Sequence, residues 1–155
     1  FHARVVVETL QFPFGQLPVL EVDGQFIPQS LAIARYLAKQ FGLAGKNDLD
    51  AAFVDAFVDQ FKDYKDATKT EFGEEARVKF FTVLVARLKK SGSSGFLIGD
   101  SLTFIDLLIA EHVVTRHERL PNFFDAYPEL LAHSEKVRSI PEIKAWIKRR
   151  PKSEM

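Results

Sequence analysis

The chain has 155 residues, of which 46% are hydrophobic and 27% are charged, as in an ordinary globular protein with a buried core. Lysine plus arginine and aspartate plus glutamate number 21 each, so the formal net charge of zero gives no electrostatic reason to expect a nucleic-acid or membrane-surface partner. Cysteine is absent, which excludes disulfides and thiolate sites, and a reducing, cytoplasmic setting is expected. No apolar run is long enough for a membrane span, and the start at Phe1 suggests a truncated or processed N-terminus.

The residue pattern in the first part of the chain predicts strands. The β-branched run Val5 to Val7 is typical of a strand, and the cluster that follows it, residues 12–15, is typical of a loop. Further on, the apolar segments 19–22 and 25–27 flank Asp23-Gly24. Because both residues of this pair tolerate positive φ, the pattern predicts a tight antiparallel hairpin.

The pattern changes to helical at Ser30. We expect Ser30 to cap a helix over residues 31–41, with Gly42 in the position after its C-cap. The apolar residues of this helix form a wide face, which predicts burial on most sides. Residues 43–48 have linker composition. We therefore predict two domains, an α/β domain over 1–42 and an all-helical domain over 49–155.

Everything after the linker has helical periodicity. A long amphipathic helix is expected from Leu49 to near Gly73, and a second helix over 74–90. The apolar stripe of the first is formed by Leu49, Phe53, Phe57, Phe61 and Tyr64 and is widened by Val54 and Val58. A third helix begins at Thr103, and prolines open two more. The last is expected to bury Ile143, Trp146 and Ile147. Strands followed by helices indicate two separately built units.

Two features near the hairpin could bind a ligand. The helix start at Ser30 carries backbone N–H groups without intrahelical partners and the positive end of the helix dipole, which together receive carboxylates or phosphates. Simple capping by Ser30 is the alternative. The Leu17-Pro18 bond precedes a strand, and a cis bond would turn the Leu17 main chain outward toward a peptide ligand. A trans bond is the commoner state.

Carboxylates recur along one face of the first long helix, at Asp55, Asp59, Asp63 and Asp66, with Lys62 among them. This face is either exposed to solvent or presents a carboxylate to a ligand amine. A site for a divalent cation is a third, less favoured interpretation, because Lys62 lies among the carboxylates.

The segment Thr103-x-x-Asp106 resembles a capping box with the shorter acid and is interpreted as structural. Of the four histidines, His112 and His117 are five apart and lie on different helix faces, so no metal site is expected. Glycine-rich phosphate loops and the G-x-S-x-G motif are absent from the sequence. The three tyrosines fall in predicted helices or at a helix start and are expected to be core or interface residues.

Taken together, residues 13–24 (PFGQLPVLEVDG) and 29–37 (QSLAIARYL) strongly resemble the sigma class of cytosolic glutathione transferases, which includes the glutathione-dependent prostaglandin D synthases. Residues 98–106 (IGDSLTFID) resemble the helix-six signature of the family, and residues 140–151 resemble its C-terminal helix. The resemblance runs from about residue 13 to the end of the chain.

The resemblance implies a thioredoxin-like N-terminal domain, here incomplete at its N-terminus, followed by an all-α helical-bundle domain. Leu17, before the family's cis proline Pro18, would bond the cysteinyl main chain of glutathione. Gln29 and Ser30 would hold the γ-glutamyl end, and Gln16 would flank the same groove.

The resemblance also implies a homodimer in which Asp63 reaches the γ-glutamyl amine of the partner's glutathione. Leu108 and His112 would line the site of a hydrophobic electrophile. Some members bind a divalent cation with three aspartates, and the middle one corresponds to Lys62 here, so no metal is expected.

The sequence departs from the family pattern at its beginning. In the family, a tyrosine just after the first strand hydrogen-bonds the glutathione sulfur and favours the thiolate, which is the nucleophile. We find no counterpart of this tyrosine, so the catalytic residue is unassigned. The predicted function is conjugation of glutathione to small hydrophobic electrophiles, a detoxification reaction. The alternatives are a catalytically impaired, truncated binding or dimerisation module and a crystallin-like structural protein.

Overall fold

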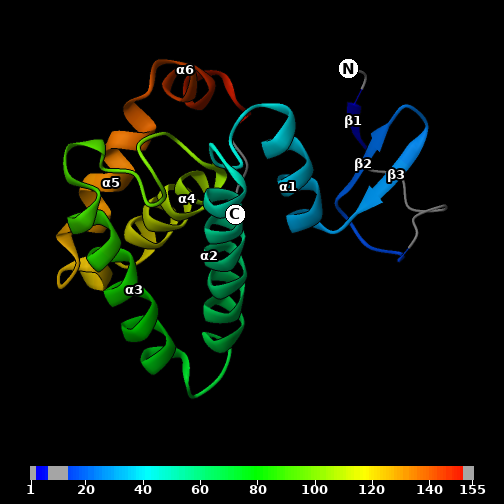
Figure 1. Cartoon of the computed structure of the whole chain (residues 1–155). Helices are drawn as coiled ribbons and strands as arrows, with labels where there is room; N and C mark the ends of the chain where they lie inside the picture. The colour runs from blue at the N-terminus through cyan, green and yellow to red at the C-terminus, as the bar shows by residue number, and fades with distance from the viewer. Residues whose placement is uncertain (1–2, 7–13, 152–155) are drawn as a thin grey trace. The chain divides into compact units, whose positions relative to one another are not determined.

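The computed structural model describes residues 3–6 and 14–151. The chain divides into two compact units, Phe1–Ala44 and Gly45–Met155, which Figure 1 shows with their helices and strands labelled. Each unit is described by itself below.

The first unit contains a three-stranded antiparallel sheet in the order β1-β2-β3, with β1 at Ala3–Val6, β2 at Val19–Val22 and β3 at Gln25–Pro28. The β2–β3 turn has φ values of 48° at Asp23 and 79° at Gly24, both in the left-handed region that a two-residue hairpin favours. The predicted hairpin is confirmed. The strand predicted at Val5 to Val7 overlaps β1, and Val7 lies outside the described residues.

Helix α1 spans Ser30–Gln40 and packs on the sheet. The prediction that Ser30 is its N-cap is wrong, because Gln29 occupies that position with φ 73° and makes no side-chain cap bond. The left-handed backbone at Gln29 turns the chain into the helix at once, so Ser30 is already helical. At the other end Gly42 has φ 70° and Leu43 N donates to Ala38 O at 2.8 Å, which closes the helix as predicted.

The core of the first unit is small. One cluster in it contains three buried residues with three partly buried ones packed against them: Leu20, Val22 and Ile33, with Ile27, Tyr36 and Leu37. The expectation that α1 is buried on most sides is wrong, because only Ile33 and Ala38 of this helix are buried. A thin sheet with a single helix of its own offers too little apolar surface to cover more.

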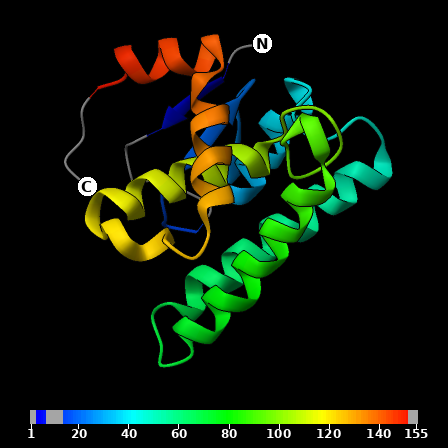
Figure 2. The ribbon, with the colours of Figure 1, turned by 90° about the vertical axis from the view of Figure 1, so that its left-hand side faces the viewer.

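The second unit is all-helical. Its elements are α2 (Asp48–Ala67), α3 (Gly73–Lys90), α4 (Phe104–Arg119), α5 (Pro128–Ser139) and α6 (Pro141–Arg149), with short 3₁₀ turns at Gly92–Ser94 and Pro121–Phe124. Figures 1 and 2 show α2 and α3 lying side by side and joined by a turn.

The first long helix ends earlier than predicted, at Ala67 rather than near Gly73. The hydroxyl of Thr68 donates to Lys65 O at 2.7 Å, and the hydroxyl of Thr70 donates to Ala67 O at 2.8 Å. These bonds satisfy carbonyls of the last turn, so the threonines support a helix end that periodicity alone did not reveal.

Aromatic side chains dominate the core of the second unit. Tyr64 stacks on Phe80 at 5.4 Å between ring centroids, and Phe81 stacks on Phe124 at 5.4 Å. The buried face of α2 is narrower than the predicted apolar stripe, because Leu49 and Phe53 are 66% and 40% exposed. The buried residues of α2 are Val54, Val58, Phe61 and Tyr64.

Helix α6 also differs from the prediction. None of its residues is buried, and Trp146 is 51% exposed although it was expected to face inward. Its ring packs instead against Arg149, whose guanidinium lies 5.4 Å from the ring centroid.

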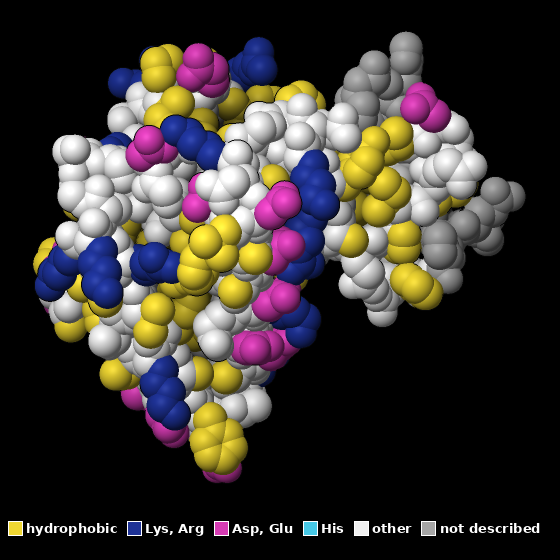
Figure 3. Space-filling view, in the orientation of Figure 1, with side chains coloured by type: hydrophobic (Ala, Val, Ile, Leu, Met, Phe, Trp, Pro, Cys, Tyr) yellow, Lys and Arg dark blue, Asp and Glu magenta, His cyan; other side chains and the backbone are white. Residues whose placement is uncertain are grey.

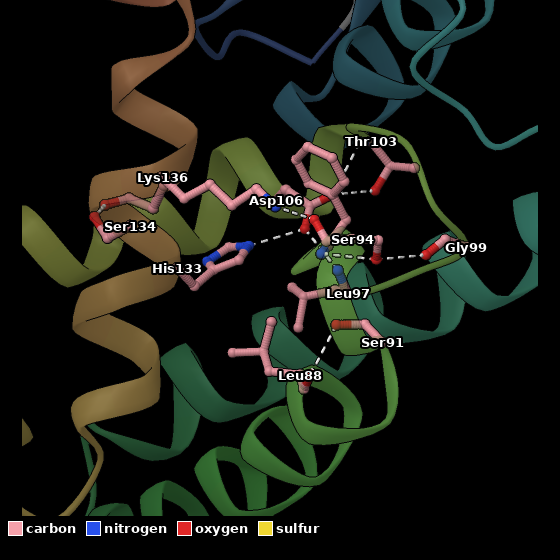
Figure 4. A network of polar contacts seen from close by, with 12 residues as sticks. Leu88, Ser91, Ser94, Leu97, Gly99, Thr103, Asp106, His133, Ser134 and Lys136 are labelled. Atoms are coloured by element: carbon pink, nitrogen blue, oxygen red, sulfur yellow. Dashed lines mark hydrogen bonds and ion pairs between the residues drawn. The ribbon is translucent and has the colours of Figure 1, made fainter.

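A polar network anchors the start of α4 (Figure 4). The carboxylate of Asp106 is completely buried and accepts hydrogen bonds from Thr103 N at 2.9 Å and from Thr103 Oγ1 at 2.8 Å. The bond from Thr103 N, together with the bond that the Thr103 side chain accepts from the main chain of Asp106, forms the predicted capping box. The same carboxylate also accepts from Leu97 N at 2.9 Å and contacts His133 Nε2 at 2.9 Å. The network therefore ties the preceding loop and α5 to the helix start.

Candidate glutathione-binding site

A small cavity lies in the first unit where the loop before β2 meets the start of α1. Its volume is about 60 Å³, and it is lined by Phe14, Gln16, Leu17, Pro18, Pro28, Gln29 and Ser30. The structure thus brings together five residues that the sequence singled out. These are Gln16, Leu17, Pro18, Gln29 and Ser30.

The loop that forms one side of the cavity is exposed, and Leu17 lies on it. The Leu17–Pro18 peptide bond is cis, as the resemblance implies, and the Leu17 side chain is 51% exposed. Strand β2 begins directly afterwards at Val19, which is buried. Leu17 is therefore accessible on a loop that is anchored by the sheet.

The other side of the cavity is the positive end of α1. The first intrahelical bond runs from Ile33 N to Gln29 O at 3.0 Å, so the N–H groups of Ser30, Leu31 and Ala32 have no partner within the helix. The side chain of Gln29 makes no cap bond to them. Unsatisfied N–H groups and the helix dipole together favour a carboxylate here.

The size of the cavity limits what it encloses. A volume of 60 Å³ corresponds to about two water molecules at liquid density. It accommodates one terminal group of a ligand, such as a carboxylate, and a longer peptide would continue along the exposed loop at Leu17.

Asp63 belongs to the second unit and does not line this cavity. It lies exposed on α2, where acidic side chains follow the helix (Figure 3), and borders a separate hollow of about 560 Å³ between α2 and α3. Apolar residues dominate the lining of that hollow: Ala56, Phe57, Ala67, Phe72, Phe80 and Val83 among others.

The acidic face of α2 is partly neutralised. Asp66 forms ion pairs with Lys62 at 2.9 Å and with Lys69 at 2.8 Å. Hydrogen bonds from Lys69 and Lys62 lower the pKa of Asp66 to about 2. Within the described ranges, 3–6 and 14–151, His, Asp and Glu side chains nowhere form a group of three that could hold a metal ion.

Leu108 and His112 lie one turn apart on α4, and both are half-buried. The sequence did not reveal the partner of His112, which is Tyr64 of α2, with 3.1 Å between the hydroxyl and Nε2. Burial raises the pKa of Tyr64 to about 12. Burial, reinforced by the charges of Arg116 and Lys65, lowers the pKa of His112 to about 4.

The structure assigns no catalytic hydroxyl in the described part of the chain. Tyr36 packs against the core of the first unit, Tyr64 is 1% exposed, and Tyr127 contacts Phe81 edge-on at 5.2 Å. None of the three lines the cavity beside Ser30.

None of the helices in the described residues is both long and apolar enough to span a membrane.

Comparison with known proteins identifies the family. Residues 47–150 match the model of the glutathione S-transferase C-terminal domain, and residues 9–39 match the model of its N-terminal domain. Probable glutathione S-transferase 5 of Caenorhabditis elegans is 46% identical over 162 residues, which cover 93% of this chain and 77% of the relative.

Two solved structures are similar in both fold and sequence. A Nu-class glutathione transferase from Haemonchus contortus matches with a TM-score of 0.83 and 46% identity, and a monomeric glutathione S-transferase from the hookworm Necator americanus with 0.83 and 44%. Each match covers 93% of this chain and 78% of the other. The chain therefore belongs to the glutathione S-transferase family of enzymes, and it has the family's fold of a short thioredoxin-like domain followed by an all-helical domain.

Proposed function

We propose that this protein binds reduced glutathione and conjugates its thiolate to small hydrophobic electrophiles, a detoxification reaction. One observation carries the proposal. Five of the six residues expected to bind glutathione from sequence resemblance line one cavity at the start of α1, whose first N–H groups lack intrahelical partners.

In this site the γ-glutamyl carboxylate accepts hydrogen bonds from the N–H groups at the start of α1 and from the Ser30 hydroxyl. Gln29 binds the same end of the peptide. The cysteinyl main chain pairs with the main chain of Leu17, and Gln16 flanks the groove. The small volume at the helix start fits this division, because only the terminal carboxylate has to be enclosed.

The chemistry is nucleophilic attack by the glutathione sulfur on a carbon of the electrophile. The protein favours the thiolate over the thiol, since the thiolate is the reactive form. The group that stabilises the thiolate is not assigned to a described residue. The second candidate function is a module that binds glutathione without turnover, and the described residues that line the cavity include no tyrosine.

We further propose a sigma-class homodimer in the cytoplasm, in which Asp63 serves the glutathione site of the partner. The exposed position of Asp63 beside an apolar hollow supports this role. The monomeric hookworm relative shows why the assembly needs its own test. Sedimentation equilibrium of this chain, alone and with Asp63→Ala, should give the mass of a dimer, and a monomer at micromolar concentration would refute the homodimer.

The experiment that tests the function has two stages. Retention on immobilised glutathione and elution by free reduced glutathione test binding, with Ser30→Ala as the weakened variant and the exposed Ser93→Ala as the control. Conjugation of a chromogenic aryl halide then tests turnover. Retention with turnover supports the transferase, and retention without turnover supports the binding module. Failure of both leaves the structural, crystallin-like alternative.

A further inference from the structure

The segment directly after α3 contains three serines in different environments. The Ser91 hydroxyl donates to Leu88 O at 2.8 Å, and the Ser94 hydroxyl donates to Gly99 O at 3.3 Å (Figure 4). Ser93, which lies between them in the chain, is exposed, and its hydroxyl has no hydrogen-bond partner among the described residues. Ser93 is therefore the serine of this segment whose hydroxyl is open to another enzyme.

Basic residues precede Ser93 on the last turn of α3. Arg87, Lys89 and Lys90 stand six, four and three positions before it. Lys89 pairs with Glu129 at 2.9 Å, whereas Lys90 is exposed and forms no ion pair with a described carboxylate. Because complementary charge decides which partner binds, a basic segment before an accessible serine suits a protein kinase with an acidic substrate groove.

The backbone around Ser93 can open without disturbing the core. Gly92 and Gly95 flank the serine with φ values of 57° and 60°, and Gly92–Ser94 forms a single 3₁₀ turn. The buried chain resumes at Leu97, which is 2% exposed. An acceptor segment has to be extended to enter an enzyme groove, and a short exposed turn with few buried contacts opens at little cost in free energy.

A cation from α5 lies beside the same turn. Lys136 Nζ donates to Ser94 O and lies 4.7 Å from the centroid of the Phe96 ring. An ammonium group has three N–H donors, so this bond leaves two for a further acceptor. Because Ser93 is the chain neighbour of Ser94, a phosphate on its hydroxyl lies within reach of Lys136. The negative end of the α3 dipole opposes a phosphate here, and the three cations of the last helical turn offset that effect.

We propose that Ser93 is a phosphorylation site for an ATP-dependent protein kinase that selects basic residues before its acceptor, and that the phosphate pairs with Lys136. In the transfer, the Ser93 hydroxyl oxygen forms a bond to the γ-phosphorus of ATP. The bond from that phosphorus to the oxygen bridging it to the β-phosphate breaks, and ADP leaves with the electron pair. The hydroxyl proton passes to the carboxylate base of the kinase. No step involves glutathione, so the proposal stands apart from the proposed function.

Phosphate transfer to the folded full chain tests the site. The chain is incubated with Mg·ATP and the catalytic domain of protein kinase C, which selects basic residues, and the product is mapped by mass spectrometry. We expect one phosphate per chain, on Ser93. Ser93→Ala should abolish the transfer, and Ser91→Ala should keep it. Lys90→Glu should lower kcat/KM for the chain about tenfold, whereas Lys144→Glu, at an exposed lysine of α6, should leave it unchanged.

A peptide of residues 86–97 separates recognition from accessibility. Transfer to the peptide but not to the folded chain would show that the fold hides Ser93, and the proposal would be wrong. Absence of transfer to both would show that the basic residues do not direct the kinase, which also overturns it. Modification of a different serine, or an unchanged kcat/KM in Lys90→Glu, has the same consequence.

The pairing with Lys136 is tested by ³¹P NMR of the phosphorylated chain. The second pKa of phosphoserine is about 6, and a neighbouring ammonium group favours the dianion. We expect the phosphate to titrate at a lower pH in the folded chain than in the phosphorylated peptide. Lys136→Met should move the midpoint toward that of the peptide, and Lys144→Met should not.

The comparison of chain and peptide needs no substitution, so it decides the pairing even if Lys136→Met fails to fold. Equal midpoints in the two would contradict the pairing. A lowered midpoint that Lys136→Met leaves unchanged would assign the effect to the lysines of α3 and would also contradict it.

Discussion

The helix that borders the small cavity of the first unit begins differently from the two capped helices of the second unit. Helix α2 is capped by Asn47, whose side chain accepts from Asp50 N at 2.9 Å, and α4 is capped by Thr103 and Asp106. Helix α1 begins at Gln29 with no side-chain cap. Helices α3, α5 and α6 also lack a side-chain cap, but only the start of α1 lines the small cavity of the first unit. A protein that binds a carboxylate with its main chain needs a helix start whose first N–H groups can donate to the ligand.

The hydrophobic cores of the two units also differ in size. The first unit buries a cluster of three apolar residues, whereas the second has a continuous aromatic core that includes Tyr64, Phe81 and Phe124. Since hydrophobic stabilisation grows with the apolar area buried, most of the folding free energy resides in the helical unit. The first unit contributes the candidate ligand contacts.

The largest expected effect comes from removing the buried carboxylate of the helical unit. Asp106→Ala leaves two backbone N–H groups, the Thr103 hydroxyl and His133 without their acceptor. We expect a loss of about 3–5 kcal/mol in the free energy of unfolding, measured by urea denaturation. Asp100→Ala, at an exposed carboxylate paired only with Lys46, should change it by less than about 0.5 kcal/mol. Equal effects of the two substitutions would contradict the assigned role of the network.

A core substitution in the first unit should show whether the two units unfold independently. Ile33 is 9% exposed and belongs to the small cluster under the sheet. Ile33→Ala should destabilise this unit by about 2–4 kcal/mol, while far-UV circular dichroism of the helical unit persists at the urea concentrations where glutathione binding is lost. Coincident loss of both signals would show that the units unfold together.

The sequence predicted the parts of the fold that depend on local chemistry. The Asp23-Gly24 turn, the Gly42 helix end and the Thr103–Asp106 capping box all follow from residue types at fixed spacing, and the structure contains all three. The residues around the small cavity were also singled out, because family resemblance links Leu17 and Ser30, which lie on separate elements.

The sequence did not predict features that depend on tertiary contacts. The exposure of Phe53, which the sequence places in the same apolar stripe as the buried Val54, follows from which face of α2 meets α3 and α4. The Tyr64–His112 contact joins residues from two helices, so spacing along the chain carries no signal for it.

The pH dependence of stability tests the same contact. The pKa of His112 is about 4 in the folded protein and 6.5 in its ordinary state, so between these values the unfolded chain binds a proton that the folded chain does not. Stability is therefore complete above pH 6.5 and falls as the pH drops toward 4. Allowing for partial exposure of the ring, we expect this group to account for about 1–2 kcal/mol of the loss. Between pH 7 and pH 4, the free energy of unfolding should decrease less in His112→Leu than in His117→Leu. Parallel curves for the two variants would contradict the lowered pKa of His112.

The smallest expected effects come from substitutions at the start of α2, which has a side-chain cap, and at the start of α1, which has none. Asn47→Ala removes the cap of α2 and should cost about 1 kcal/mol of unfolding free energy, with retention on immobilised glutathione unchanged. Ser30→Ala removes no cap, so its unfolding free energy should change by less than about 0.5 kcal/mol, while glutathione binding should weaken about tenfold because a hydrogen bond to a carboxylate is lost. Calorimetric titration measures the affinity of each variant for glutathione, and urea denaturation measures the free energy of unfolding of each. The reverse outcome, with Ser30→Ala less stable and binding normally, would make Ser30 a structural residue and remove the reason for placing a carboxylate at the start of α1.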